Sequence, residues 1–251
     1  MAAQEKVAFI TGANKGIGLE TARGLGKLGI AIVMASRDEA KGRAAAETLK
    51  SEGIKNVEAV RFDVIRPEDH REIARRLETR LGKLDILVNN AGVMLDKADF
   101  EAPMVNTTST VTPAILRQTF ETNFFAVVAL TQTLLPLIRK APAGRIVNLS
   151  SILGSLTLHS DPSTGIYDKK AFAYDASKTA INAFTVHLAH ELRGTKIKVN
   201  SAHPGWVKTD MGGAAAPMEL SEGGKTSVQL ATLPDDGPTG GYFHLGQPLP
   251  W

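Results

Sequence analysis

The chain has 251 residues, of which 43% are hydrophobic and 22% charged, and its formal net charge is +3. This composition is typical of a globular protein that buries one substantial core, so we expect a single domain over residues 1–251. Charges of both signs alternate, as in REIARRLE at 71–78, which argues against a nucleic-acid partner. Cysteine is absent, which excludes disulfides, thiolate metal ligands and cysteine nucleophiles.

The N-terminal sequence MAAQEKVAFITGA lacks the basic segment and long apolar run of a secretory signal. No apolar stretch is expected to reach the length of a membrane span. The sequence therefore predicts a cytoplasmic protein without a membrane partner.

Short β-branched runs alternate with helical patterns along the chain. The runs are apolar on both faces, as in parallel strands that helices cover from both sides. This pattern predicts βαβ units in a doubly wound parallel sheet of the α/β class. Strands are expected at 7–11, 30–36, 57–62, 85–89, 144–150 and 196–202. Helices are expected near 17–28, 38–52, 67–81, 113–139, 171–193 and 222–231.

Two segments have no regular pattern. The stretch 94–112 is interpreted as a surface loop or an extra cap. The Gly- and Pro-rich tail at 233–251 is expected to be ordered against the domain, although the sequence does not decide this.

Three glycines, Gly12, Gly16 and Gly18, lie between the first strand and the first helix in TGANKGIG. Glycine lets a diphosphate approach the backbone, and the helix N-terminus offers unpaired N–H groups. A tight structural turn would explain an isolated glycine triplet equally well. The position after the first strand of an alternating α/β chain favours a dinucleotide site.

The second strand ends in VMASRDEA, with Ser36 where an acid would bind the 2′-hydroxyl of NAD, followed by Arg37. Lys15, inside the glycine turn, could add a second cation for a 2′-phosphate. Alternatively, Arg37 pairs with Asp38 or Glu39 and Lys15 is simply exposed. We predict NADP(H) rather than NAD.

Five further motifs follow in order: NNAG at 89–92, Asn123 in TNFFAV, IVNLSS at 146–151, AYDASK with Tyr174 and Lys178, and PGWVKTD at 204–210. A tyrosine and a lysine four positions apart share a helix face, but such pairs also arise by chance. Together with TGANKGIG, these motifs resemble the short-chain dehydrogenase/reductase family over most of the chain. Within that family the sequence is most similar to the carbonyl reductases that use NADPH.

The resemblance implies a Rossmann-type fold and NADP(H)-dependent reduction of a ketone or aldehyde to the alcohol by hydride transfer. It implies that Tyr174 donates the proton, that Lys178 supplies a cation and holds the nicotinamide ribose, and that Ser151 binds the substrate oxygen. Asn123 matches the residue that holds a water molecule beside the lysine. A phenol has a pKa near 10, so a neighbouring cation is expected to lower the pKa of Tyr174.

The resemblance also implies the residues that line the cofactor and substrate sites. Trp206 follows the sixth strand, at the edge where open α/β sheets bind ligands, and Leu156 and Met211 are expected as further apolar walls. Substrate contacts are expected from Ser151, Leu153, Tyr174 and Trp206. Cofactor contacts are expected from Gly12, Asn14, Lys15, Gly16, Ile17, Gly18, Ser36, Arg37, Asp63, Val64, Asn90, Ala91, Gly92, Tyr174, Lys178, Pro204, Gly205, Val207 and Thr209.

Other candidate residues have simpler interpretations. Tyr167 lacks a lysine four positions later and is interpreted as a pocket-wall or surface aromatic. His187 and His190 are three apart on one helix but have no third ligand at suitable spacing, so no metal site is predicted. His159 and His203 are interpreted as structural, as is Ser150 beside Ser151.

Two alternatives to carbonyl reduction stay open: reduction of an imine or activated alkene at the same site, and a dinucleotide-sensing module without catalysis. The segment between Ser151 and Tyr174 is shorter than in the animal carbonyl reductases, where an insertion covers a helix face. We therefore expect a homodimer or homotetramer formed through helices 113–139 and 171–193, or else a monomer in which 94–112 and the tail cover that face. An open site should favour medium-sized hydrophobic carbonyl compounds over charged sugars.

Overall fold

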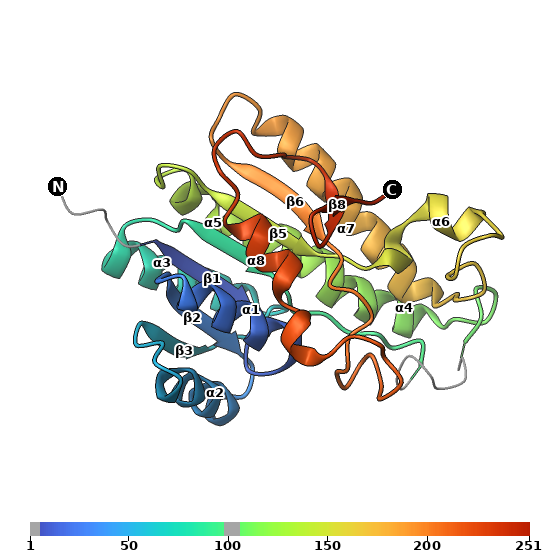
Figure 1. Ribbon diagram of the computed structural model, residues 1–251, viewed down its shortest axis with the longest axis horizontal. Helices are drawn as coiled ribbons and strands as arrows, with labels where there is room; N and C mark the ends of the chain where they lie inside the picture. The colour runs from blue at the N-terminus through green and yellow to red at the C-terminus, as the bar shows by residue number, and fades with distance from the viewer. Residues whose placement is uncertain (1–5, 98–105) are drawn as a thin grey trace.

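The computed structural model describes residues 6–97 and 106–251, which form one α/β unit around an eight-stranded sheet (Figure 1). The strand order is β3-β2-β1-β4-β5-β6-β7-β8, and every neighbouring pair is parallel except β7 and β8. The strands are β1 (Val7–Thr11), β2 (Ala31–Ser36), β3 (Val57–Arg61), β4 (Ile86–Asn89), β5 (Arg145–Leu149), β6 (Lys198–Ala202), β7 (Tyr242–His244) and β8 (Gln247–Pro248).

Helices connect successive strands and cover both faces of the sheet (Figure 1). They are α1 (Gly16–Lys27), α2 (Glu39–Ser51), α3 (Pro67–Leu81), α4 (Pro113–Phe120), α5 (Ala126–Ile138), α6 (Leu156–Ser160), α7 (Phe172–Glu191) and α8 (Lys225–Ala231). Shorter turns are the π-helical η1 (Glu121–Phe125) and the 3₁₀-helical η2 (Ile152–Gly154) and η3 (Leu220–Glu222).

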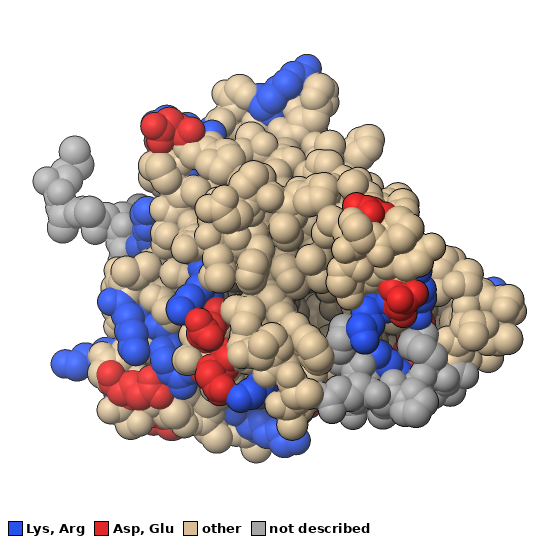
Figure 2. Space-filling view, turned by 45° about the vertical axis from the view of Figure 1, so that its right-hand side comes forward, with Lys and Arg blue, Asp and Glu red and all other residues tan. Residues whose placement is uncertain are grey.

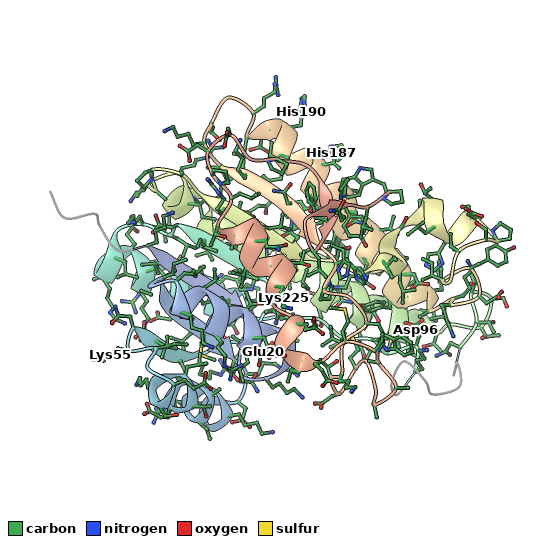
Figure 3. The ribbon with its side chains drawn as sticks, in the orientation of Figure 1. Glu20, Lys55, Asp96, His187, His190 and Lys225 are labelled. Carbon is green, nitrogen blue, oxygen red and sulfur yellow. The ribbon has the colours of Figure 1, made fainter. Side chains whose placement is uncertain are left out.

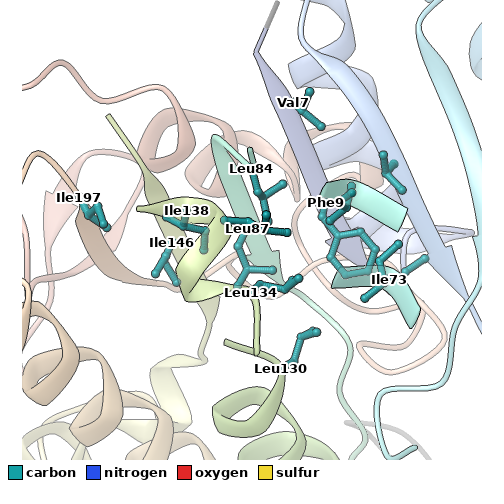
Figure 4. Close-up of a cluster of buried hydrophobic side chains, with 14 of the residues drawn as sticks. Val7, Phe9, Ile73, Leu84, Leu87, Leu130, Leu134, Ile138, Ile146 and Ile197 are labelled. Carbon is teal, nitrogen blue, oxygen red and sulfur yellow. The ribbon is translucent and has the colours of Figure 1, made fainter. Parts of the chain in front are cut away.

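Two apolar cores sandwich the sheet because successive side chains of a strand point to opposite faces. On β1, Phe9 packs in the core under α3, α5 and α7, which Figure 4 shows in close-up. Its neighbour Ile10 packs in the core under α1, α2 and α8. Both residues are 0% exposed. The strands are apolar on both faces for this reason, and the predicted doubly wound sheet is confirmed.

The carboxyl edge of the sheet gathers the loops that carry the predicted site. β1 and β4 are neighbours although they are not consecutive, so the connections leave this pair in opposite directions. Ligands of open α/β sheets bind in the crevice at such a switch point. Most of the predicted cofactor residues lie in the loops after β1 through β6. The exceptions are Gly16, Ile17 and Gly18, which open α1, Ser36, which ends β2, and Tyr174 and Lys178, which lie on α7.

The predicted strands are confirmed to within two residues at each end. The helix predicted at 113–139 is interrupted by η1, and the helix predicted at 222–231 begins at Lys225, after the 3₁₀ turn η3. Helix α6 and the β7–β8 hairpin were not predicted. The tail is ordered, as expected, because the hairpin joins the sheet through β6. Residues 1–5, which bear on the signal-sequence expectation, and 98–105 of the irregular stretch lie outside the described residues.

One described helical stretch, Pro113–Ile138, is long and apolar enough to span a membrane by length and composition, contrary to the expectation from sequence. In the structure 44% of its most apolar 18-residue window is buried, and Leu130 and Leu134 belong to the core under the sheet. This is the behaviour of a core helix. On the face that Figure 2 displays, positive and negative side chains adjoin one another and leave a broad uncharged area.

Candidate active site

The turn after β1 has the backbone of a phosphate-binding loop. Gly12 and Gly16 adopt positive φ angles of 63° and 59°, a region that other residues rarely occupy. A Cβ atom on Gly18 would lie 2.5 Å from both the Asn90 Nδ2 atom and the Gly12 carbonyl oxygen. Glycine is therefore required at these positions for the turn to close against the loop after β4.

The N-terminus of α1 is open to an anion. Its N-cap residue, Lys15, provides no side-chain hydrogen bond, so no side chain of the cap satisfies the first-turn N–H groups. Asn14 and Ile17 flank the start of the helix and are partly exposed. Free backbone N–H groups beside glycines are the donors that a diphosphate needs, so these residues fit a dinucleotide.

The loop after β4 is held against this turn by Thr11. Its Oγ1 accepts the N–H groups of Asn90 and Ala91 at 2.9 and 3.0 Å, and the Asn90 Nδ2 donates to the Thr11 carbonyl at 2.7 Å. Gly92 follows, where a Cβ atom would lie 3.5 Å from the Lys178 Nζ. The predicted residues of both loops are thus brought together beside Lys178.

The end of β2 presents one exposed cation. The buried Ser36 hydroxyl donates to the Asp38 carbonyl at 2.8 Å, and Arg37 is exposed. Arg37 does not form the alternative ion pairs with its acidic neighbours, because the Asp38 carboxylate caps α2 and Glu39 pairs with Arg43. The guanidinium is therefore available at the position where a 2′-phosphate is expected.

Asp63 and Val64 follow β3 at the same edge, and both are partly exposed. The Asp63 Oδ1 accepts the Ile65 N–H at 3.3 Å, and the Val64 carbonyl lies 2.6 Å from the His70 Nε2. These bonds shape a turn beside Arg37 on the neighbouring strand's loop, where an adenine ring is expected.

Tyr174, Ser151 and Lys178 converge at the carboxyl end of β5. The Ser151 side chain lies near the Tyr174 hydroxyl and acts to lower its pKa. The Lys178 Nζ lies 5.5 Å from the centre of the Tyr174 ring and donates to the Leu149 carbonyl at 2.8 Å. Ser151 itself caps the turn η2, where its Oγ accepts the Leu153 N–H at 3.3 Å. A proton donor, a hydroxyl and a cation therefore share one site.

Burial controls the ionisation of these groups. It raises the pKa of Tyr174 to about 12, although the Ser151 side chain acts in the opposite direction. Burial also lowers the pKa of Lys178 to about 8. The expectation that the pKa of Tyr174 is lowered is therefore wrong for this structure, because desolvation is the largest influence on the phenol and raises its pKa. At neutral pH the phenol keeps its proton and the lysine is still mostly charged.

Asn123 lies in the π-helical turn η1, and its side chain joins two parts of the site. Its Oδ1 accepts the Val93 N–H and its Nδ2 donates to the Val93 carbonyl, each at 2.8 Å. The same Nδ2 donates to the Ser177 Oγ at 3.0 Å. Because π-helical turns frequently occur at functional sites, this irregular turn is itself a functional signal that the sequence pattern did not reveal.

The loop after β6 closes the site opposite the glycine turn. Pro204 and Val207 are buried, and Gly205 needs its positive φ of 92°. The Trp206 Nε1 donates to the Gly212 carbonyl at 2.6 Å, which fixes the indole within this loop.

The glycine turn and this loop meet at two points. A Cβ atom on Gly16 would lie 3.8 Å from the Thr209 Cγ2. Lys15 is not simply exposed, because its Nζ lies 2.5 Å from the Asp210 Oδ2, which lowers the pKa of Asp210. Side-chain exposures of 70% and 81% make this a weak ion pair, so it does not prevent Lys15 from turning to a phosphate.

A small apolar cluster surrounds Tyr174. Met94 and Leu153 are buried beside it, and Met211 packs against them. Leu156 is 62% exposed and does not join the cluster, so its prediction as a wall is wrong; it lies on the outer side of the short helix α6. Leu153 and Met211, two of the other predicted walls, provide an apolar lining beside the phenol, whereas Trp206 is not part of this cluster.

Two buried carboxyl groups lie next to Tyr174, those of Asp96 and Asp175, and neither was predicted as a site residue. Asp96 is 0% exposed, and burial raises the pKa of Asp175 to about 8, with a further contribution from the charge of Asp96. The Asp175 Oδ2 lies 3.4 Å from the His159 Nε2. Asp175 stands next to the tyrosine in AYDASK, but no motif marks Asp96, whose place depends on how its loop folds.

The remaining histidines have structural positions. His203 is buried, which lowers its pKa to about 3, and its Nδ1 accepts the Ile152 N–H at 3.1 Å. His187 and His190 point away from the sheet on the exposed side of α7 (Figure 3). Within residues 6–97 and 106–251, no three His, Asp or Glu side chains are arranged to hold a metal ion.

Comparison with known proteins agrees with this geometry. Residues 6–220 match the family model described as short chain dehydrogenase. The chain is 32% identical to carbonyl reductase [NADPH] 1 of Mus musculus over 289 aligned positions, covering 100% of both chains. The alignment is longer than the chain, so this relative contains segments that the chain lacks.

Two solved structures are similar over almost their whole length. One is salutaridine reductase from Papaver somniferum, with a TM-score of 0.83, 30% identity, and coverage of 95% of this chain and 99% of that chain. The other is an NADPH-bound carbonyl reductase from chicken fatty liver, with a TM-score of 0.82, 28% identity, and coverage of 99% and 100%. The chain therefore belongs to the short chain dehydrogenase family.

Proposed function

We propose that this protein reduces the carbonyl group of small hydrophobic ketones or aldehydes with NADPH, and that Tyr174 is the general acid. The observation that carries the proposal is the arrangement on α7, where the Lys178 Nζ lies 5.5 Å from the centre of the Tyr174 ring, next to the Ser151 side chain that acts on the pKa of the phenol. The NADPH in the names of the mouse and chicken relatives supports the choice of cofactor.

The cofactor, when bound, supplies the hydride. The glycine turn and the N-terminus of α1 fit its diphosphate, and Arg37 offers the cation for a 2′-phosphate. Lys178, next to Gly92, would hold the nicotinamide ribose.

The substrate oxygen binds between the hydroxyl groups of Ser151 and Tyr174. As the carbonyl carbon is reduced, its oxygen becomes an alkoxide, which is a stronger base than a phenolate and so takes the Tyr174 proton. The Lys178 ammonium stabilises the phenolate that is left, and this effect is strong because the site is buried. Met94 and Leu153 exclude water and favour apolar substrates.

Replacing Tyr174 with Phe tests the role of the phenol, because it removes the proton and little else. We expect kcat for NADPH-dependent ketone reduction to fall by on the order of 100-fold or more, with the NADPH Kd changed less than about threefold. A panel of ketones, aldehydes, quinones, charged sugars, imines and enones should be followed by NADPH consumption. A Tyr174→Phe variant that keeps more than about a tenth of the activity would rule out general-acid catalysis by Tyr174.

In the substrate panel, an imine or enone that is reduced faster than every carbonyl compound would assign the site to the alternative reaction.

A further inference from the structure

A fully buried carboxyl group contacts the first turn of the helix that carries Tyr174. The Asp96 Oδ1 accepts the Ala173 N–H at 2.9 Å, and its Oδ2 accepts the Tyr174 N–H at 3.0 Å. Asp96 is 0% exposed and lies in the segment after β4, 77 positions before Ala173 (Figure 3). The backbone of Tyr174 is therefore bonded directly to a distant part of the chain.

Helix α7 has no cap from its own N-cap residue. That residue is Ala171, which has no polar side chain, so the N–H groups of the first turn need other acceptors. Asp96 supplies two of them, and a carboxyl group also interacts favourably with the positive end of the helix dipole. The Asp175 Oδ2 accepts the Ala171 N–H at 2.9 Å and completes the cap.

The segment that carries Asp96 is itself held in place. Asn123 makes hydrogen bonds with both the N–H and the carbonyl of Val93. Met94 packs in the same buried cluster as Tyr174. Asp96 thus reaches α7 from a fixed support, so its two bonds can determine where the helix begins.

We propose that Asp96 is a positioning residue for Tyr174, fixing the first turn of α7 and hence the place where the Tyr174 hydroxyl meets Ser151. The inference rests on the proposed role of Tyr174 as general acid. Lys178, one turn further along, is held separately by its bond to the Leu149 carbonyl at 2.8 Å. Loss of Asp96 should therefore displace the phenol more than the lysine.

Two variants test this role, Asp96→Ala and Asp96→Asn. In Asp96→Ala we expect the Ala173 and Tyr174 amides to exchange with deuterium at least about tenfold faster, because both lose their acceptor. We expect kcat to fall on the order of 10- to 100-fold, since a catalytic group displaced by about 1 Å costs about that much, while the NADPH Kd changes less than about threefold. Asp96→Asn keeps one acceptor oxygen and should give intermediate values for both measurements. If Asp96→Ala does not fold, the same two measurements are made on Asp96→Asn.

Asp85→Asn is the matched control. Asp85 is 3% exposed and its Oδ2 accepts the Val7 N–H at 2.9 Å, at the opposite edge of the sheet. This variant should lower Tm without changing kcat or the exchange of the α7 amides. Unchanged exchange at Ala173 and Tyr174, or a kcat loss in Asp96→Asn no larger than in the control, would overturn the proposal. The exchange rates do not depend on turnover, so they still test the contact if Tyr174→Phe remains active and the proposed chemistry fails.

Discussion

Lys178 is buried, and this burial gives the proposed reaction a dependence on pH. Its pKa is lowered to about 8, so the ammonium is present below that value and is lost above it. We expect kcat/KM for ketone reduction to be level below about pH 8 and then to fall about tenfold per unit as the cation disappears.

The measurement is kcat/KM between about pH 6 and about pH 10 at saturating NADPH, with a substrate that does not titrate. The pKa of Tyr174, raised to about 12, lies too high to produce this fall. A profile that stays level to about pH 10 would mean that the charge of Lys178 is not needed.

Arg37 is the residue on which the cofactor preference should depend. It is exposed and free of the ion pairs that its acidic neighbours could have formed, so its guanidinium can bind a 2′-phosphate. Arg37→Asp should lower the ratio of kcat/KM for NADPH over NADH by about 10- to 100-fold, the value of a hydrogen bond to a charged group.

Arg43→Asp serves as the control. It changes the charge by the same amount as Arg37→Asp, but at a residue on α2 that is already paired with Glu39. It should leave the ratio nearly unchanged. Equal kcat/KM values for NADPH and NADH in the unmutated protein would contradict the predicted preference for NADPH.

The proposed catalytic residues could be predicted individually because each lies in a short motif of fixed spacing. Tyr174 and Lys178 lie one helical turn apart, and Ser151 ends a strand motif. Asp96 could not be predicted, since its contact with α7 depends on the path of a loop without a repeating pattern. The pKa of Tyr174 was also predicted in the wrong direction, because a sequence shows a neighbouring cation but not the loss of solvent around the phenol.

Among the elements, the π-helical turn η1 deserves a direct test through Asn123. Asn123→Ala removes its three hydrogen bonds, which join Val93 and Ser177, at a residue that is 1% exposed. We expect a loss of about 2 to 4 kcal/mol in the free energy of unfolding, because buried backbone and hydroxyl groups lose partners. Urea unfolding measures this loss, and kcat should fall as well, since Val93 adjoins Gly92.

Thr119→Ala is the comparison for this prediction. Thr119 is 0% exposed one turn earlier, and its hydroxyl has no hydrogen-bond partner among the described residues. Thr119→Ala removes a buried methyl and a buried hydroxyl group but no hydrogen bond. It should therefore lower the free energy of unfolding by only on the order of 1 kcal/mol. Equal destabilisation by the two substitutions would show that the bonds of Asn123 do not hold the turn.

The elements differed in how far the sequence could predict them. Strands β1 and β2 are apolar runs buried on both faces, which is a strong pattern, whereas the edge strand β3 is only partly buried. The turn η1 leaves the hydrophobic period of its helix nearly intact, so 113–139 looked continuous. Helix α6 has 5 residues and β8 has 2, too few for any periodicity to identify.

For the whole molecule, the exposed apolar side chains of η1 and α7 favour self-association. Phe125 is 54% exposed and Val186 is 41% exposed, and the ordered tail packs elsewhere, with Trp251 stacked on Tyr242. We expect a mass of two or four times 26.8 kDa by light scattering coupled to size exclusion. The double variant Phe125→Glu with Val186→Glu should give the monomer mass, because a buried unpaired charge is costly.

Leu28→Glu provides the control for the assembly, since Leu28 is 61% exposed at the end of α1. It should not change the mass. A mass of 26.8 kDa for the unmutated protein at micromolar concentration would contradict the prediction and leave the two apolar side chains facing solvent.

From β5 onward, every strand pairs with the strand made just before it. Among the strands of the described residues, only β4 departs from this order, because it pairs with β1 after β2 and β3 have been added on the other side. During synthesis from the N-terminus, the sheet therefore grows at a single edge once β4 has joined. The glycine turn and Arg37 belong to the part that can assemble first, whereas Tyr174 and Lys178 emerge only after β5. On the ribosome, the half that fits a dinucleotide should consequently take shape before the half that performs the chemistry.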